Sequence, residues 1–519
     1  MDIRAFGVAA AVVVGLASCG GAAPPAPPRP ALSRAVTSAE PARPPPDPAP
    51  GRAEDLDAIV KRVMAEEKIV GASVLVARGD RVVLHEGYGL ADLGLEVRAK
   101  DETVYHVVGP MLPFTGIAVM QQVERGKLSL DDDVSKYVPE LPMQGHHVTI
   151  RQLLNHTSGI VDYHYLGDPI EATSRQPKAL DEVMALYAGK SWVNPPGEKW
   201  DWSISGFQLL VTIVERVTGQ AFADYARQSI FGPAGVASTT YCDDTSVVRG
   251  LAHAYRRAGD VHVPAHESAT AYNSDLRFCS TVGDLHRLWR SIREKRLVAP
   301  ETFARMTTAE GAAVHTSAQD PKAQYGFAIL LGHEEDHRRV GQHGSLLGYA
   351  GSLYEFPEDH LTIVVLTNTE GQNALAITRA LSRAILGLPE LPPHPSPPDR
   401  TLDDGPISAA DRRQLAGTFV LKVERVTPNL HDSFAQYRRT YRVFDENGRL
   451  MIEALGEAPE RLLKQPDGSF AVRSSPEARI VFTPPSGRPA AMKIDSPGFP
   501  LSGARVGEGD PKTFHQQMR

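Results

Sequence analysis

Hydrophobic and polar positions follow two kinds of spacing between residues 53 and 387. Some segments have apolar residues at helical intervals, and others are short apolar or alternating runs typical of strands. The predicted helices are 55–69, 115–126, 150–156, 180–188, 207–218, 222–230, 282–292 and 374–386, and the predicted strands are 72–77, 81–85, 325–331, 347–356 and 361–367. Strands stand at both ends and helices fill the middle, so the pattern predicts an α+β domain with a sheet flanked by helices.

A proline-rich break at 388–402 separates this domain from a second pattern over 403–519. The second region holds short alternating segments, such as 417–423 and 439–443. Turn signals lie between such segments, for example at 446–448 and 466–468. We therefore expect a small antiparallel β-barrel after the linker.

The first 52 residues lack the periodicity of a folded domain. Arg4 precedes an apolar run at 6–16, which is too short for a membrane-spanning helix and predicts a signal peptide over 1–18. The four residues that end at Cys19 resemble a bacterial lipobox, which implies a lipid on that cysteine; the alternative is an ordinary signal peptide with a chance cysteine. Eleven prolines between residues 24 and 50 predict a semi-rigid tether over 19–52. The expected location is the periplasmic face of an outer membrane or the cell surface, with the membrane bound through the lipid.

Length, charge and cysteine content further narrow the possible domain number, partners and cofactors. A chain of 519 residues is too long for a single core. The 55 basic and 62 acidic residues give a net charge of −7 without a basic block, which argues against a nucleic-acid partner. Cys242 and Cys279 lie 37 positions apart, and this spacing alone leaves a disulfide open. No cysteine-rich metal spacing is present, so we expect no metal or other cofactor.

Several stretches of the first domain match the motifs of one known family. These stretches are 114–121, 126–132, 149–159, 196–197 and 280–285. Together they resemble the serine β-lactamase and D-alanyl-D-alanine carboxypeptidase group, in its class C and esterase-like branch. The resemblance implies an antiparallel sheet flanked by helices with a helical subdomain. Residues 415–419 likewise resemble the start of a lipocalin-like module that is often appended to such proteins.

The resemblance also implies three catalytic motifs, and each is degenerate here. The Ser-x-x-Lys that supplies nucleophile and base falls on Gly109 and Leu112, and none of the fourteen lysines has Ser or Thr three residues before it. The Tyr-x-Asn motif falls on Trp202, Ser203 and Ile204. The Lys-x-Gly or His-x-Gly motif falls on residues 342–344, where glutamine replaces the cation.

These losses predict a pseudoenzyme with no catalytic residue at this site. A more apolar binding site would remain, for an unknown peptide, small molecule or protein. Its expected lining is Gly109, Leu112, Trp202, Ile204, Gln342 and Gly344.

Two other hypotheses stay open. The first is a serine hydrolase of esterase, β-lactamase or peptidase type that uses a displaced group, with Ser203, Ser345 or His343 as substitutes. We expect His343 to point away from the site, because neighbouring strand residues face opposite sides. The second is an adhesion or assembly module that acts through the C-terminal β domain.

Three further signals have plainer interpretations. Residues 333–337 spell His-Glu-Glu-Asp-His, but their place between two strand patterns predicts a charged hairpin turn instead of a zinc helix. Asp131, Asp132 and Asp133 are expected to form a polar turn and helix cap. Ser158 is expected to be a turn residue, and His146 and His147 are expected in a solvated loop.

Overall fold

The computed structural model describes residues 52–509 apart from internal gaps. The gaps are 168–179, 191, 243–246, 259–260, 266–277, 314–321, 347, 372, 392–401, 425–436, 455–458, 474, 476–477, 485–486 and 497–499. The predicted signal peptide, Cys19 and nearly all of the tether lie outside the described residues. Among those that are described, no helix is both long and apolar enough to cross a membrane.

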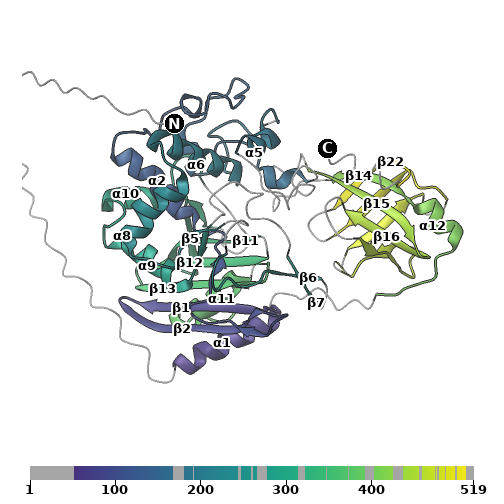
Figure 1. Cartoon of the computed structure of the whole chain (residues 1–519), viewed down its shortest axis with the longest axis horizontal. Coiled ribbons are helices and arrows are strands. Elements are labelled where there is room, and N and C mark those ends of the chain that lie inside the picture. Colours follow the sequence, from purple (N-terminus) through teal and green to yellow (C-terminus); the bar gives the residue numbers. More distant parts are fainter. Residues whose placement is uncertain are drawn as a thin grey trace, which may run out of the picture. The chain divides into compact units, whose positions relative to one another are not determined.

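An eight-stranded antiparallel sheet forms the centre of the first domain (Figure 1). Its order is β3-β2-β1-β13-β12-β11-β10-β9. The strands are β1 Gly71–Arg78, β2 Arg81–Asp92, β3 Val97–Arg98, β9 Gln324–Tyr325, β10 Leu330–Glu334, β11 His337–Leu346, β12 Tyr349–Phe356 and β13 Leu361–Thr367. Strands from the two ends of the domain thus pair side by side, as β1 does with β13.

Helices cover both faces of this sheet, which explains why β1 is buried along nearly its whole length. Val74 and Val76 pack in one core with α1 (Arg52–Glu66) and α11 (Asn373–Leu386). Leu75 and Ala77 pack in the other core with α2 (Leu112–Glu124) and α9 (Val282–Arg293). Successive side chains of a strand point to opposite faces, so both sets are apolar.

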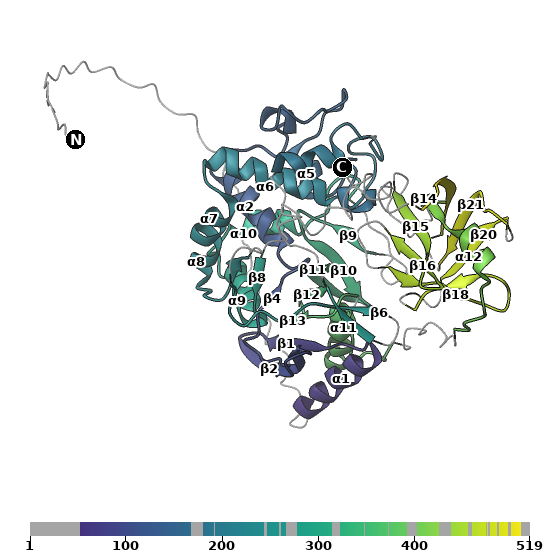
Figure 2. The same ribbon diagram turned by 45° about the vertical axis from the view of Figure 1, so that its right-hand side comes forward.

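The middle of the chain forms a helical subdomain, and Figure 2 shows its helices α5 and α6 on the side of the domain away from α1. Thr149 and Gln152 begin α3 with a reciprocal capping box. The helices and short helical turns are α3 Ile150–Leu154, α5 Leu180–Tyr187, α6 Ile204–Thr218, α7 Phe222–Ala226, α8 Gly232–Ala234, α10 Pro300–Met306, η1 Val134–Lys136, η2 Tyr163–Leu166 and η3 Arg227–Phe231.

Two small sheets lie beside the main one. Strands β4 (Tyr105–His106), β8 (Phe278–Ser280) and β5 (Thr240–Tyr241) form the first, and β6 (Tyr255–Ala258) and β7 (Val261–Pro264) form the second. The pairing that the sequence left open is present, because a disulfide joins Cys242 and Cys279 with their Cα atoms 5.8 Å apart.

The C-terminal region is a nine-stranded antiparallel sheet that nearly closes into a barrel. Its two end strands, β17 and β18, are separated in the chain by one residue, so the sheet curls back toward its own edge. The elements are α12 Ala409–Leu415, β14 Gly417–Val423, β15 Arg438–Glu446, β16 Arg449–Ala454, β17 Glu460–Arg461, β18 Leu463–Lys464, β19 Phe470–Ala471, β20 Arg479–Thr483, β21 Ala491–Asp495 and β22 Leu501–Gly507. The predicted fold class is therefore confirmed.

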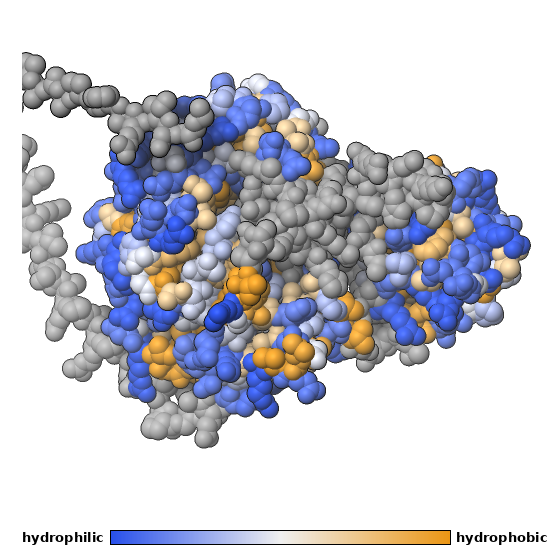
Figure 3. Space-filling view, in the orientation of Figure 1, coloured by the Kyte–Doolittle hydropathy of each residue, from blue (hydrophilic) through white to orange (hydrophobic). Residues whose placement is uncertain are grey.

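Several predicted bounds were wrong: β2 runs on to Asp92 beyond the expected 81–85, and α6 begins at Ile204 where 207 was expected. Two further differences have a local cause. The strand expected at 325–331 is two strands, because Ala328 has a φ of 63° and breaks the extended run between β9 and β10. Helix α2 begins at Leu112, three residues earlier than expected, with Pro113 in its first turn, where a missing N–H costs no hydrogen bond. On the face drawn in Figure 3, the apolar residues lie in scattered patches among hydrophilic ones, which is ordinary for a protein surface.

Candidate functional site

Gly109 lies with its backbone directly against strand β11. A Cβ atom at this position would lie 2.3 Å from the carbonyl carbon of His343 and 2.5 Å from the nitrogen of Gly344. A Cβ at Gly344 would in turn lie 3.1 Å from the Cα of Gly109. Gly109 also has a φ of 88°, which residues with a side chain rarely adopt. The position expected for the nucleophile therefore has no room for any side chain.

Leu112, at the position expected for the lysine, is part of the hydrophobic core. It is the first residue of α2, its side chain is 1% exposed, and it packs with Met111 and Phe114. Its backbone N–H donates to the carbonyl of Gly109 at 2.9 Å. An ammonium group here would have to be buried among apolar side chains, which is costly without a partner.

The Trp202-Ser203-Ile204 segment forms the start of α6. The Trp202 ring stacks on His156 with 4.4 Å between centroids. The Ser203 hydroxyl accepts from the backbone N–H of Gly206 at 3.3 Å and so caps the helix. The backbone N–H of Ile204 donates to Asp162 Oδ2 at 3.0 Å. All three residues thus hold the helix end, and Ser203, which is buried, is engaged as a cap.

Gln342 and His343 point to opposite faces of the sheet. Gln342 is buried on the face of α2, and its Nε2 donates to the hydroxyl of Tyr325 at 2.7 Å. His343 pairs with Ser352, whose hydroxyl accepts from Thr378 of α11, and its Nδ1 lies 2.6 Å from the hydroxyl of Tyr354. The alternation expected from the sequence is present, so the imidazole lies across the sheet from Gly109 and α2.

Comparisons with known proteins identify the family of this chain. The Beta-lactamase family model matches residues 56–388. The chain belongs to the beta-lactamase family. Among curated relatives, penicillin-binding protein 4* of Bacillus subtilis is 26% identical over 432 residues, which cover 79% of this chain and 90% of the relative. Protein flp of Staphylococcus aureus is 25% identical over 342 residues, which cover 64% of this chain and 66% of the relative.

Solved structures support the same fold. The octameric penicillin-binding protein homologue of Pyrococcus abyssi has a TM-score of 0.59 and 20% identity, and the match covers 86% of this chain and 99% of that one. The D-amino acid amidase of Ochrobactrum anthropi SV3 has a TM-score of 0.58 and 18% identity, with 64% and 99% of the two chains covered. The resemblance inferred from the motifs is thereby confirmed.

In this beta-lactamase-family chain, His156 organises an aromatic cluster that the sequence analysis missed. The buried ring stacks between Trp202 and Phe207, with 4.9 Å between the His156 and Phe207 centroids, and Tyr325 meets it edge-on at 4.8 Å. Its Nδ1 accepts the backbone N–H of Ser203 at 3.1 Å, so in the neutral ring the proton lies on Nε2. The motif at 149–159 marked this histidine, but its partners lie 40 or more residues away in sequence.

A buried carboxylate, also missed, ties η2 to the start of α6. Asp162 is 0% exposed and accepts backbone N–H groups from His164 at 2.9 Å and Ile204 at 3.0 Å. Burial alone would raise the pKa of Asp162. The side chain of His164 and the backbone donors outweigh burial and bring this pKa below its ordinary value.

The other candidate residues take part in ordinary structure. Ser345 Oγ accepts from the Gly371 N–H at 2.7 Å and donates to the Tyr349 carbonyl, and Ser158 Oγ accepts from the Ile160 N–H. Residues 333–337 form the predicted hairpin between β10 and β11.

The acidic triplet and the two neighbouring histidines also have structural partners. Asp132 and Asp133 accept backbone N–H groups of Ser129 and Ser135, and Asp131 pairs with Arg151. His147 is 92% exposed beside Asp133, and the ring of His146 packs against Trp192.

Replacing Gly109 should be far more disruptive than replacing another glycine of positive φ. For Gly109→Ala we expect a loss of unfolding free energy about 1–3 kcal/mol larger than for Gly126→Ala, because overpacking adds to backbone strain only at Gly109. Gly126, just after α2, has a φ of 68° and nothing within 4 Å of a Cβ. The chain's four tryptophans all lie before residue 388, so their fluorescence in a urea titration reports this domain. Equal losses in the two variants would contradict the contact.

Asp162 should contribute to stability only at a pH where it is charged. The pKa of Asp162 in the folded protein is below the value of about 3.9 in the unfolded chain. Its contribution to the free energy of unfolding is therefore complete above about pH 3.9 and is lost as the pH falls from there through the folded pKa. We expect Asp162→Asn to lose about 2 kcal/mol at pH 7 and to approach the wild type in acid. The test is the urea midpoint between pH 7 and pH 3. Asp336→Asn, whose parent side chain is 99% exposed, is the control. If the difference in urea midpoint between wild type and Asp162→Asn stayed constant from pH 7 to pH 3, this role of Asp162 would be refuted.

Proposed function

We propose that this protein is a non-hydrolytic member of the beta-lactamase family that binds a ligand of the cell envelope. One observation carries the proposal: the backbone of His343 and Gly344 occupies the space that a side chain at Gly109 would need. A serine hydrolase needs a hydroxyl at this point and a base within hydrogen-bond reach of it. Here the first is sterically excluded and the second is replaced by the core residue Leu112.

The remaining polar groups at the site support the same conclusion. Gln342 bonds to Tyr325, Ser203 caps a helix, and His343 lies on the far face with Tyr354. When the nucleophile and base of a comparable triad are removed, only the acceleration due to binding groups is left. Such a scaffold can still bind a ligand. We propose that this ligand is a peptide, a small molecule or a protein partner.

The proposal also includes a lipid anchor near the N-terminus, on Cys19. A diacylglyceryl group on Cys19 would hold the protein to a membrane, and residues 19–52 would space the folded part from it. The support for this step is the lipobox-like sequence, the short apolar run before it and the eleven prolines after it.

Reagents that acylate or phosphonylate serine hydrolases should leave the purified protein unlabelled. We expect no covalent adduct with a fluorescent penicillin or a fluorophosphonate, because no hydroxyl stands where the family's nucleophile would be. Gel fluorescence and intact mass measure the result, with penicillin-binding protein 4* of Bacillus subtilis treated in parallel to show that the reagents are active. A stoichiometric adduct on this protein would overturn the non-hydrolytic assignment.

Cys19 should decide whether the full-length protein stays with membranes. When the chain is expressed in a bacterium, we expect the wild type in the membrane fraction with a mass increased by its lipid. Cys19→Ser should move to the soluble exported fraction. Cys242→Ser is the control for loss of a cysteine as such, and it should remain in the membrane fraction. If Cys19→Ser fractionates like the wild type, the anchor is wrong.

A further inference from the structure

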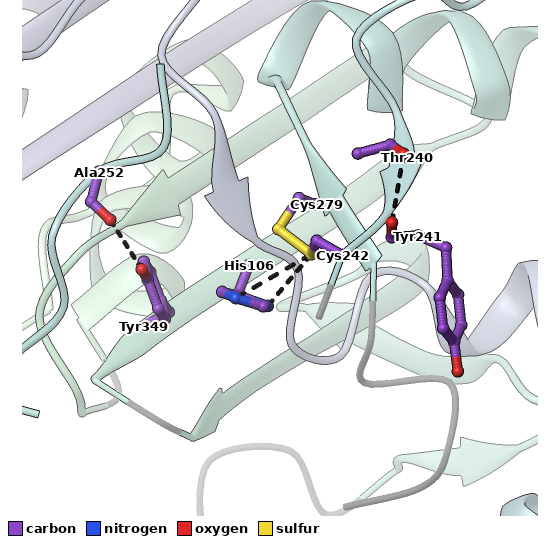
Figure 4. Close-up of a disulfide and its surroundings, with 7 residues drawn as sticks. All are labelled: His106, Thr240, Tyr241, Cys242, Ala252, Cys279 and Tyr349. Atoms are coloured by element: carbon purple, nitrogen blue, oxygen red, sulfur yellow. Dashed lines mark hydrogen bonds between the residues drawn. A yellow bond between two sulfur atoms is a disulfide. The ribbon is translucent and has the colours of Figure 1, made fainter. Parts of the chain in front are cut away.

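Three strands of the small sheet β4-β8-β5 bring an imidazole and two sulfur atoms to one place. His106 on β4 is directly opposite Cys279 on β8, and Thr240 of β5 is opposite Cys279 on the other side. Cys242 directly follows β5, and its disulfide to Cys279 holds it beside this pair. Figure 4 shows the His106 ring beside the sulfur of Cys242.

The His106 imidazole already lies at a ligand-to-ligand distance from one sulfur, whereas the two sulfurs are bonded to each other and would have to separate to about 3.8 Å around a tetrahedral zinc. The Nδ1 atom of His106 lies 3.4 Å from the Sγ of Cys242, and the ligand atoms of all three residues lie within 4.8 Å of one another. A tetrahedral Zn²⁺ with Zn–S bonds of about 2.3 Å and a Zn–N bond of about 2.0 Å holds its N and S ligands about 3.5 Å apart. The imidazole therefore already stands where a metal bound to Cys242 would need it.

The surroundings favour such an ion once the sulfurs are free. Both cysteines are buried, and the core around them consists of Val104 with Val248 beside it. An apolar shell limits solvent access and strengthens ligand binding. His106 is half-buried and packs against the ring of Tyr349, with 5.3 Å between the ring centroids.

We propose that His106, Cys242 and Cys279 form a redox-gated site for Zn²⁺ or a similar divalent metal. In the oxidised protein the disulfide occupies both sulfurs. A dithiol reductant transfers two electrons and two protons to it, which breaks the S–S bond, leaves two thiols and closes a disulfide in the reductant. Binding of Zn²⁺ then displaces the two thiol protons and forms two Zn–S bonds and one Zn–N bond, with water as the fourth ligand.

A metal at this site would restrain the segment from His106 to Gly109, which leads into the degenerate motif. His106 precedes Gly109 by three residues, and the segment between them runs from β4 to the contact with β11. A metal bound to His106 would fix the start of this segment through a bond that the disulfide form does not make. The proposal does not depend on the site at Gly109 being inactive.

Cobalt is the probe, because Co²⁺ bound to thiolates absorbs light while Zn²⁺ does not. The whole protein is reduced with dithiothreitol, freed of reductant without oxygen and titrated with Co²⁺, with thiol counts and circular dichroism recorded. We expect two thiols in a folded protein, thiolate-to-cobalt charge-transfer bands at one Co²⁺ per chain, and loss of these bands when Zn²⁺ is added. The oxidised protein should show none of the bands.

His106→Ala separates a metal site from a structural disulfide. It should still form the disulfide but bind Co²⁺ more weakly by more than roughly 100-fold, the upper end of what loss of an outer hydrogen-bond partner costs. His85→Ala, which removes another half-buried histidine, on strand β2, should bind like the wild type. The proposal is overturned by a disulfide that cannot be reduced in the folded protein, by unfolding on reduction, by absence of the bands, or by equal affinity in His106→Ala.

Discussion

The backbone contact between Gly109 and the His343-Gly344 stretch of β11 governs what this part of the molecule can hold. It joins the segment before α2 to a strand more than 230 residues later in the chain. A Cβ atom at Gly109 would clash with the strand backbone, and one at Gly344 would be tight, 3.1 Å from the Cα of Gly109. Because the contact is between backbones, a change of side chain cannot relieve it; one of the two segments would have to move. The proposed lack of a nucleophile therefore rests on the packing at Gly109 as well as on the sequence.

The substitutions around this contact form a consistent set. Removal of a buried ammonium and a phenol would leave their partners unsatisfied unless those partners changed as well. Leu112 fills its place with apolar contacts, Gln342 bonds to Tyr325, and Trp202 stacks on His156. These three side chains therefore each have contacts within the scaffold.

The sequence predicted the fold through periodicity, and it failed where a feature depends on contacts between distant segments. Val74, Leu75 and Val76 form a local apolar run whose side chains point to alternate faces of the sheet. A sheet with helices on both faces was therefore predictable. The start of α2 was missed because Pro113 looks like a break although it is tolerated in a first turn. The roles of His156 and Asp162 depend on partners such as Ser203 and Ile204, more than 40 residues away, which spacing alone does not show.

Asp162 and His156 also explain how the start of α6 is held independently of any catalytic motif. Both hold the first turn of α6, where a helix leaves backbone N–H groups without intrahelical partners. Asp162 accepts the N–H of Ile204, and His156 accepts that of Ser203. Both bonds reach backbone atoms. The Asp162 bond does not involve the side chains at 202 and 204, whereas the His156 ring also stacks on Trp202. The proposed loss of the Tyr-x-Asn side chains is therefore compatible with an intact helix start, because the bond from Ile204 to Asp162 does not involve them.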